Sequence, residues 1–170
     1  MNKKFSQGFI KDPSSTFAAV IVKDSITQKF LILTSNEEAI DESDFKRTIN
    51  CKVDLNKDIT QQLVKELYGL GVLTNSYREV SRNNRVSFSF ADDTPGYVVT
   101  DVCFYVEADI PNLNAITQVY EGYDAALVSF NDFASGIIES PISGYETLVA
   151  VSHLTAEYKF LQEPTSGTTV

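Results

Sequence analysis

The stretch Asp58-Ile-Thr-Gln-Gln-Leu-Val-Lys-Glu-Leu-Tyr-Gly-Leu-Gly-Val72 decides the fold, because it predicts one helix with a defined beginning and end. Asp58 can accept hydrogen bonds from the first-turn amides, and Gly71 can adopt the left-handed conformation that ends a helix. The apolar residues recur at a spacing of three and four and so share one side of the helix: Ile59, Leu63, Val64, Leu67 and Leu70. The polar side holds a single carboxylate, Glu66.

The composition predicts one compact domain rather than two. The chain has 170 residues, of which 43% are hydrophobic and 11% aromatic, which is enough to bury a full core. Its 23 acidic and 14 basic residues give a formal charge of -9, which repels phosphate backbones and anionic lipid over most of the surface. We therefore expect neither nucleic-acid nor membrane binding, although a local pocket could still collect a small anion.

The cysteines and the N-terminus indicate a cytoplasmic protein, in a bacterium or in a host cell. Cys51 and Cys103 are too few for a disulfide framework and lie outside any zinc motif, so we expect two reduced thiols, with Cys103 buried. The N-terminal lysines precede no apolar core of a signal peptide, and no run is long enough to span a membrane.

The remaining chain predicts a sheet with helices against it. Strands are expected at 16–23 and 29–34 as a hairpin, within 45–53, and at 76–80, 85–90, 97–107 and 124–130. Polar residues 81–84 predict a turn, 111–122 a connection, Asn131 the cap of a brief helical turn at 132–135, and 144–154 a second helix. The expected organisation is an N-terminal arm at 1–15, a single domain at 16–160 and a disordered tail at 161–170.

This order of elements resembles the Nudix hydrolase fold over residues 16 to 155. Phe17-Ala-Ala-Val-Ile-Val-Lys-Asp24 is similar to the family's opening strand, and Leu63-Val-Lys-Glu-Leu67 to the centre of its signature helix. Thr94-Pro-Gly-Tyr-Val-Val-Thr-Asp-Val-Cys-Phe-Tyr-Val106 is similar to a phrase of the ADP-ribose and ADP-sugar pyrophosphatase branch, and Leu127-Val-Ser-Phe-Asn-Asp-Phe133 to the segment before the last helix. The resemblance implies an α/β (α+β) fold with a central mixed sheet between helices.

The catalytic box of the family is degenerate in this chain. Active members carry G-x5-E-x7-R-E-U-x-E-E-x-G-U, with U aliphatic, because several carboxylates must hold magnesium while water attacks a pyrophosphate. With Lys65-Glu66 at the R-E position, the other diagnostic positions hold Cys51 for glycine, Lys57 for the first glutamate, and Gly69 and Leu70 for the paired glutamates. A lone Glu66 cannot supply the anionic ligands of a magnesium-phosphate site, so we predict no catalytic residue, no metal and no cofactor.

Other acidic residues and the one histidine offer weaker candidates. Magnesium binding would be restored if other carboxylates replaced the missing ligands. The spacing of the candidates reproduces no known ligand set. The candidates are Asp54, Asp58, Asp92, Asp93, Glu121 and Asp124. The cluster Glu37, Glu38, Asp41, Glu42 and Asp44 lacks the order of a calcium loop and indicates a solvated loop. His153 lies late in an apolar helix, where a structural or surface role is expected.

Three functions follow as hypotheses. The first is a catalytically inactive Nudix-like domain that binds a nucleotide or nucleoside-diphosphate derivative, or acts as a non-enzymatic regulator. Its ligand would lie between the helix and the sheet, against Glu66, Arg85, Thr94, Pro95 and Gly96. The second is a structural or interaction protein that keeps only the scaffold, such as an adaptor or an assembly subunit, for instance of a virus. The third is a divergent magnesium-dependent pyrophosphatase. The resemblance also implies a homodimer.

Overall fold

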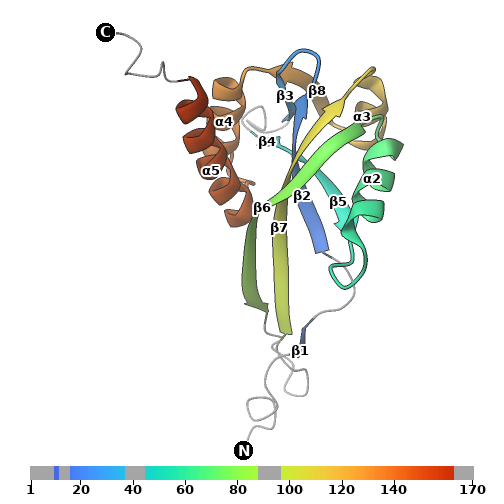
Figure 1. Cartoon of the computed structure of the whole chain (residues 1–170), viewed down its shortest axis with the longest axis vertical. Helices are drawn as coiled ribbons and strands as arrows, with labels where there is room; N and C mark the ends of the chain where they lie inside the picture. Colours follow the sequence, from blue (N-terminus) through green and yellow to red (C-terminus); the bar gives the residue numbers. More distant parts are fainter. Residues whose placement is uncertain (1–9, 12–15, 37–44, 88–96, 163–170) are drawn as a thin grey trace, which may run out of the picture.

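The computed structural model describes residues 10–11, 16–36, 45–87 and 97–162, which form a sheet between two pairs of helices (Figure 1). The strands are β1 (Ile10–Lys11), β2 (Thr16–Asp24), β3 (Phe30–Ser35), β4 (Lys46–Arg47), β5 (Ile49–Val53), β6 (Leu73–Ser87), β7 (Tyr97–Asp109) and β8 (Tyr123–Val128). The helices are α2 (Ile59–Gly69), α3 (Asn114–Val119), α4 (Phe130–Glu139) and α5 (Tyr145–Gln162). The acidic cluster at 37–44, the Thr94–Gly96 phrase and the tail from 163 lie outside the described residues.

The sheet is mixed and is centred on β2 and β7. These two strands run parallel over Ala19–Asp24 and Cys103–Ala108, while the opposite edge of β2 pairs antiparallel with β5 and β3. The other edge of β7 pairs antiparallel with β6, and β3 continues to β8 and β4. In the expected N-terminal arm, β1 adds a short parallel pairing to β7. No described helix has both the length and the apolar character that crossing a membrane requires.

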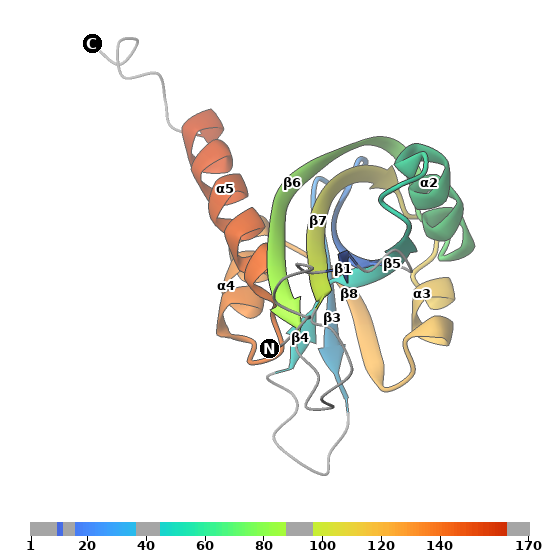
Figure 2. The same ribbon diagram turned by 90° about the horizontal axis from the view of Figure 1, so that it is seen from below.

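Side chains that alternate along the strands divide the core between the two faces of the sheet. On β2, Val20 and Val22 belong to the core under α2 and α3, whereas Ala19 and Ile21 belong to the core under α4 and α5 (Figure 2). The helices contribute Leu63, Leu67 and Ile116 to the first core, and Phe133, Ile137, Val151 and Leu154 to the second. The expected central mixed sheet between helices is confirmed.

Helix α2 has the beginning and the end that its sequence predicts. The Asp58 side chain accepts a hydrogen bond from the Thr60 amide at 2.9 Å, and Gly71 follows the helix with a φ of 74°. Leu63 and Leu67 are fully buried, so the predicted apolar side faces the sheet. Val64 is 39% exposed, at the margin of that side.

Strand β6 differs from the prediction, because it is one continuous strand and contains no turn at 81–84. Ser81, Asn83 and Asn84 pair with residues of β7, and irregularities at Thr74/Ser76 and Glu79/Ser81 absorb the changes of register. β6 pairs with β7 alone among the described strands, so polar residues such as Arg82 and Asn84 reach solvent without interrupting the ladder. The polarity of 81–84 therefore marks an edge strand and not a turn.

Three helices also differ from the prediction: α3 was not predicted, and α4 and α5 have other boundaries. The connection at 111–122 contains α3, which is anchored by the fully buried Ile116. Helix α4 runs to Glu139 and is capped by Ser129, whose hydroxyl accepts from the Asp132 amide at 3.2 Å, so the predicted cap at Asn131 is wrong. Helix α5 continues well past the predicted end at residue 154.

Asp24 fastens the turn between β2 and β3. Its Oδ2 accepts hydrogen bonds from the Thr27 amide at 2.8 Å and the Thr27 hydroxyl at 2.7 Å, and its Oδ1 accepts from the Ile110 amide at 3.3 Å. Burial alone would raise the pKa of this carboxyl, but the hydrogen bonds from Thr27 and Ile110 outweigh it and lower the pKa below its usual value. The carboxylate thus stabilises the folded state in its ionised form.

Asp24→Ala is expected to lower the free energy of unfolding by about 2 kcal/mol at neutral pH, because the partly buried hydrogen bonds from the Thr27 and Ile110 amides lose their charged acceptor. A lowered pKa gives stability that is present above the unfolded pKa and lost as the pH falls, so the difference from the wild type should shrink in acid. Urea denaturation measures both effects. Glu121→Ala, which removes an exposed carboxylate, is the control, and an equal loss in both variants would contradict the assignment.

Candidate functional site

Glu66 lies exposed on α2, next to two groups that stay uncharged at neutral pH. Burial raises the pKa of the Cys51 thiol to about 12, with a smaller contribution from the Glu66 charge. Burial also raises the pKa of the Tyr120 hydroxyl; hydrogen bonding to Asn50 and the Arg47 charge oppose this, and the Glu66 charge adds a small upward contribution. The surroundings of Glu66 thus contain a thiol and a phenol where a metal site would need further carboxylates.

Tyr120 occupies the edge of β5 that faces away from β2. Its hydroxyl accepts a hydrogen bond from the Asn50 amide at 2.8 Å and donates one to the Asn50 carbonyl at 3.1 Å. The Arg47 guanidinium lies over the rings of Tyr120 and Tyr123, at 5.0 and 5.5 Å from their centroids. A side chain from the loop after α3 therefore satisfies backbone groups that would otherwise be free to contact a ligand.

Three of the carboxylates considered as relocated metal ligands have other partners, while Glu121 is exposed. Asp54 lies 3.9 Å from the Lys57 ammonium, Asp58 caps α2, and Asp124 accepts a hydrogen bond from Asn36 at 3.0 Å. Within the described ranges, no three acidic, cysteine or histidine side chains gather as metal ligands. Asp92 and Asp93 lie outside those ranges. The described donors around Glu66 do not fit magnesium.

A pocket of about 440 Å³ lies on the other face of the sheet, beside the same Arg47. We call it the Arg47 pocket. It lies between the β2–β5 region and the start of α5, and its walls combine an exposed aromatic ring with polar groups: Phe17, Arg47, Asn50, Ile142, Ser143, Glu146 and Thr147. Its volume is in the range of small-molecule sites. Among the described residues that line it, Arg47 is the only basic one and Glu146 is the only acidic one.

The start of α5 shapes one wall of the Arg47 pocket. The Glu146 carboxylate folds back over Gly144. Ser81 donates a hydrogen bond to the Glu146 carbonyl and ties this turn to β6. Phe17 is 64% exposed at the opposite rim. The lining thus includes an exposed ring that can stack, a basic residue and a carboxylate.

The residues predicted from the sequence do not come together in one pocket. Arg85 lies near the end of β6, where its Nε donates to the Asp101 carboxylate at 2.7 Å. Strand alternation places Asp101 on the face of Cys103, under α4 and α5, whereas Glu66 lies on α2 across the sheet. Figures 1 and 2 likewise show α2 far from the end of β6. Neither residue lines the Arg47 pocket, and Thr94, Pro95 and Gly96 are not described.

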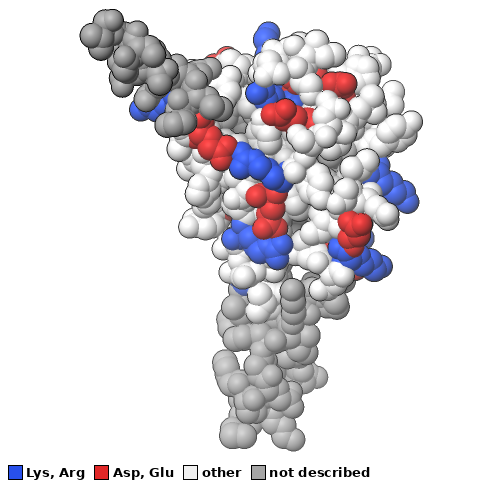
Figure 3. All heavy atoms as spheres, in the orientation of Figure 1, with Lys and Arg blue, Asp and Glu red and all other residues white. Residues whose placement is uncertain are grey.

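Opposite charges alternate on the face of the molecule that Figure 3 shows. On β6, Arg82 pairs with Glu79 at 2.5 Å and Arg85 with Asp101 at 2.7 Å, while Arg78 pairs with Glu157 of α5. These half-exposed ion pairs add little stability and leave no excess of positive charge for a phosphate. The sequence signal at Arg85 is therefore typical of a charged sheet edge.

Comparison with known proteins supports the fold. No protein-family model matches the sequence, and no curated protein is similar enough to count as a relative. A MutT protein from a study of Aliivibrio salmonicida and Vibrio cholerae is similar in structure, with a TM-score of 0.50 and 15% identity over 82% of this chain and 97% of that one. The Escherichia coli ORF135 protein gives a TM-score of 0.52 and 14% identity, over 91% and 96%. The chain has a Nudix-like α+β fold. Sequence identity to these structures is too low to support a conclusion about function.

Proposed function

We propose that this protein binds a nucleotide or nucleoside-diphosphate derivative in the Arg47 pocket without hydrolysing it. The observation that carries the proposal is that Arg47 and Phe17 line the same pocket, whose volume suits such a ligand. A guanidinium recognises phosphate oxygens, and an exposed aromatic ring stacks on a base. Asn50, Ser143 and Glu146 supply the hydrogen-bonding groups that a base or ribose requires.

The surroundings of Glu66 support the absence of hydrolysis. Nudix-type chemistry needs several carboxylates around magnesium, and Glu66 has Cys51 and Tyr120 beside it instead. The Tyr120 hydroxyl also holds both backbone groups of Asn50, so the β5 edge next to Glu66 is taken by the chain itself. The proposed role is then that of a sensor, a sequestering protein or another non-enzymatic regulator.

Arg47→Met is expected to weaken nucleotide binding about tenfold or more, because the ligand loses its charged partner while an unbranched side chain of similar length remains. Isothermal titration calorimetry with ADP-ribose, ADP and GDP measures the change. Arg85→Met is the matched control, because Arg85 lies outside the pocket and is paired with Asp101. Binding that is lost in Arg85→Met and retained in Arg47→Met would place the ligand at the residues predicted from the sequence instead.

Catalysis is tested separately. With magnesium present, none of these nucleotides should release phosphate or AMP, and Glu66→Gln should leave that result unchanged. Magnesium-dependent release that disappears in Glu66→Gln would overturn the inactive assignment and restore the pyrophosphatase hypothesis. The absence of heat with every nucleotide would instead overturn the binding proposal.

A scaffold protein that binds another protein is the second candidate. Helix α2 exposes Tyr68 to 71% and Val64 to 39%, and Leu73 just beyond the helix is 40% exposed. Val64 and Tyr68 are four residues apart, so they share one side of the helix. An apolar surface at the position of a catalytic helix suits a partner or a second copy of the chain. A stoichiometric partner in a pull-down, or a dimer in analytical ultracentrifugation, that is lost in Tyr68→Ser would favour this candidate.

A further inference from the structure

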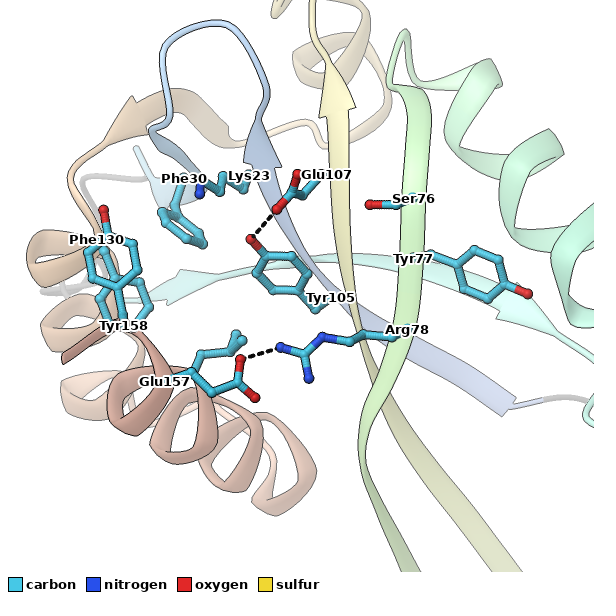
Figure 4. A pocket seen from close by; sticks show the side chains of 11 residues that line it. Lys23, Phe30, Ser76, Tyr77, Arg78, Tyr105, Glu107, Phe130, Glu157 and Tyr158 are labelled. Atoms are coloured by element: carbon cyan, nitrogen blue, oxygen red, sulfur yellow. Dashed lines mark hydrogen bonds and ion pairs between the residues drawn. The ribbon is translucent and has the colours of Figure 1, made fainter. Parts of the chain in front are cut away.

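A second pocket lies between α5 and the strands β2, β3, β6 and β7 (Figure 4). We call it the Tyr105 pocket. Its volume is about 330 Å³, and it has no lining residue in common with the Arg47 pocket. The two pockets lie toward opposite ends of α5, since the Arg47 pocket contacts Thr147 and the Tyr105 pocket contacts Tyr158.

Aromatic rings form a fixed apolar wall of the Tyr105 pocket. Phe30 and Phe130 are buried, and their rings meet edge to face with centroids 5.0 Å apart. Tyr158 stacks on Phe130 at 4.8 Å, and Tyr105 approaches Phe30 at 6.4 Å. Because these rings come from β3, β7, α4 and α5, they hold their positions without a ligand. A molecule that fits this wall needs an apolar or aromatic part.

One end of the pocket is closed by charges that neutralise each other. Arg78 of β6 pairs with Glu157 of α5, and its guanidinium lies over the Tyr105 ring at 5.3 Å from the centroid (Figure 4). This arrangement joins the strand to the helix and fixes the Tyr105 ring. Arg78 and Glu157 therefore shape the pocket and leave its recognition to other groups.

Lys23 and Glu107 provide opposite charges that do not neutralise each other. They are partners in the parallel register of β2 and β7, so they lie on one face about 5 Å apart at the backbone. They nevertheless form no ion pair with each other: the Lys23 ammonium lies 5.9 Å from the centroid of Tyr158, and the Glu107 carboxylate accepts the Tyr105 hydroxyl at 3.1 Å. Figure 4 shows both at the same end of the pocket.

We propose that the Tyr105 pocket binds a zwitterionic small molecule of the α-amino acid class with an apolar or aromatic side chain. Glu107 receives the ammonium group, Lys23 receives the carboxylate, and the side chain packs against Phe30, Tyr105 and Phe130. A simple cation would be repelled by Lys23, and a simple anion would be repelled by Glu107. A ligand with both charges is complementary to both. This site does not depend on nucleotide binding.

Titration of the full chain with matched ligands tests the charge requirement. L-phenylalanine is expected to bind, by calorimetry or by NMR shifts of residues around Tyr105. Three analogues should each bind about tenfold more weakly or worse: 3-phenylpropionate lacks the ammonium, phenethylamine lacks the carboxylate, and glycine lacks the side chain. Equal binding of 3-phenylpropionate or phenethylamine would overturn the proposal, and so would the absence of binding by both L-phenylalanine and L-leucine.

Variants then locate the site. Glu107→Gln keeps an acceptor for the Tyr105 hydroxyl and should bind L-phenylalanine about tenfold more weakly, as should Lys23→Met. Lys29→Met, in the same hairpin but outside the pocket, is the control and should bind as the wild type does. Unchanged affinity in both pocket variants, with thermal unfolding showing that they are folded, would refute the assignment. Arg47→Met should leave L-phenylalanine binding intact, which separates this site from the nucleotide proposal.

Discussion

Leu67→Ala is expected to lower the free energy of unfolding by about 2–5 kcal/mol. Leu67 is fully buried between α2 and the sheet, where it packs in the same core as Leu63 and Val72. Truncation removes apolar contact and leaves a cavity that the surrounding strands fill only in part. Urea denaturation followed by circular dichroism measures the loss, and Leu67→Met, which keeps most of the volume, should recover most of it.

The matched control for this change lies one turn away on the same helix. Val64 is 39% exposed, so Val64→Ala removes little buried surface and should cost less than about 1 kcal/mol. Both positions have the same helical backbone, which isolates the contribution of burial. Equal losses at Leu67 and Val64 would show that α2 is not held by the core under it.

Sequence patterns predicted the parts of the fold that depend on local signals. The caps of α2, at Asp58 and Gly71, act within a few residues of the helix and are both observed. The hairpin of β2 and β3 and the long strand β7 follow from apolar runs of strand length. These elements are enough to indicate a mixed sheet with helices on its faces.

The boundaries that failed depend on neighbours that are distant in sequence. Residues 81–84 look like a turn, yet they continue β6 because β7 offers a partner along the whole length. Helix α3 is short and is held by burial of Ile116 in the core under α2. Such context overrides local propensity, and periodicity alone does not reveal it.

In the candidate site, too, the sequence predicted the local features and missed the contacts between distant segments. The isolation of Glu66 follows from counting carboxylates along one helix. Tyr120 and Asn50 are 70 positions apart, and their hydrogen bonds form at the edge of β5 where no described strand pairs. Arg47, Phe17 and Glu146 likewise meet only after the strands and α5 are assembled. No spacing in the sequence indicates these contacts, so the Arg47 pocket could not be predicted from it.

The buried thiols predict that the protein loses stability in alkaline solution. Burial raises the pKa of Cys51 from 9.0 to about 12, and the nearby Glu66 charge adds to this. Burial also raises the pKa of Cys103, with the charge of Glu146 adding and a hydrogen bond with Thr147 opposing. Above pH 9 the unfolded chain releases these protons while the folded protein keeps them. The stabilisation is thus complete below the unfolded pKa and is lost as the pH rises toward the folded pKa.

Between the unfolded and the folded pKa of a thiol, each rise of one pH unit lowers the free energy of unfolding by about 1.4 kcal/mol per thiol. The measurement is urea denaturation under reducing conditions at about pH 8 and about pH 11, on the wild type and on the double variant Cys51→Ala, Cys103→Ala. The variant loses packing at both pH values, but its decline between them should be smaller by roughly 3–5 kcal/mol. Tyr105 and Tyr120 are present in both proteins, so their contributions cancel apart from the small upward effect of the Cys51 charge on the pKa of Tyr120. Parallel declines would show that the thiols are not held neutral by the fold, and that neither Cys51 beside Glu66 nor Cys103 under α5 is as buried as the structure places it.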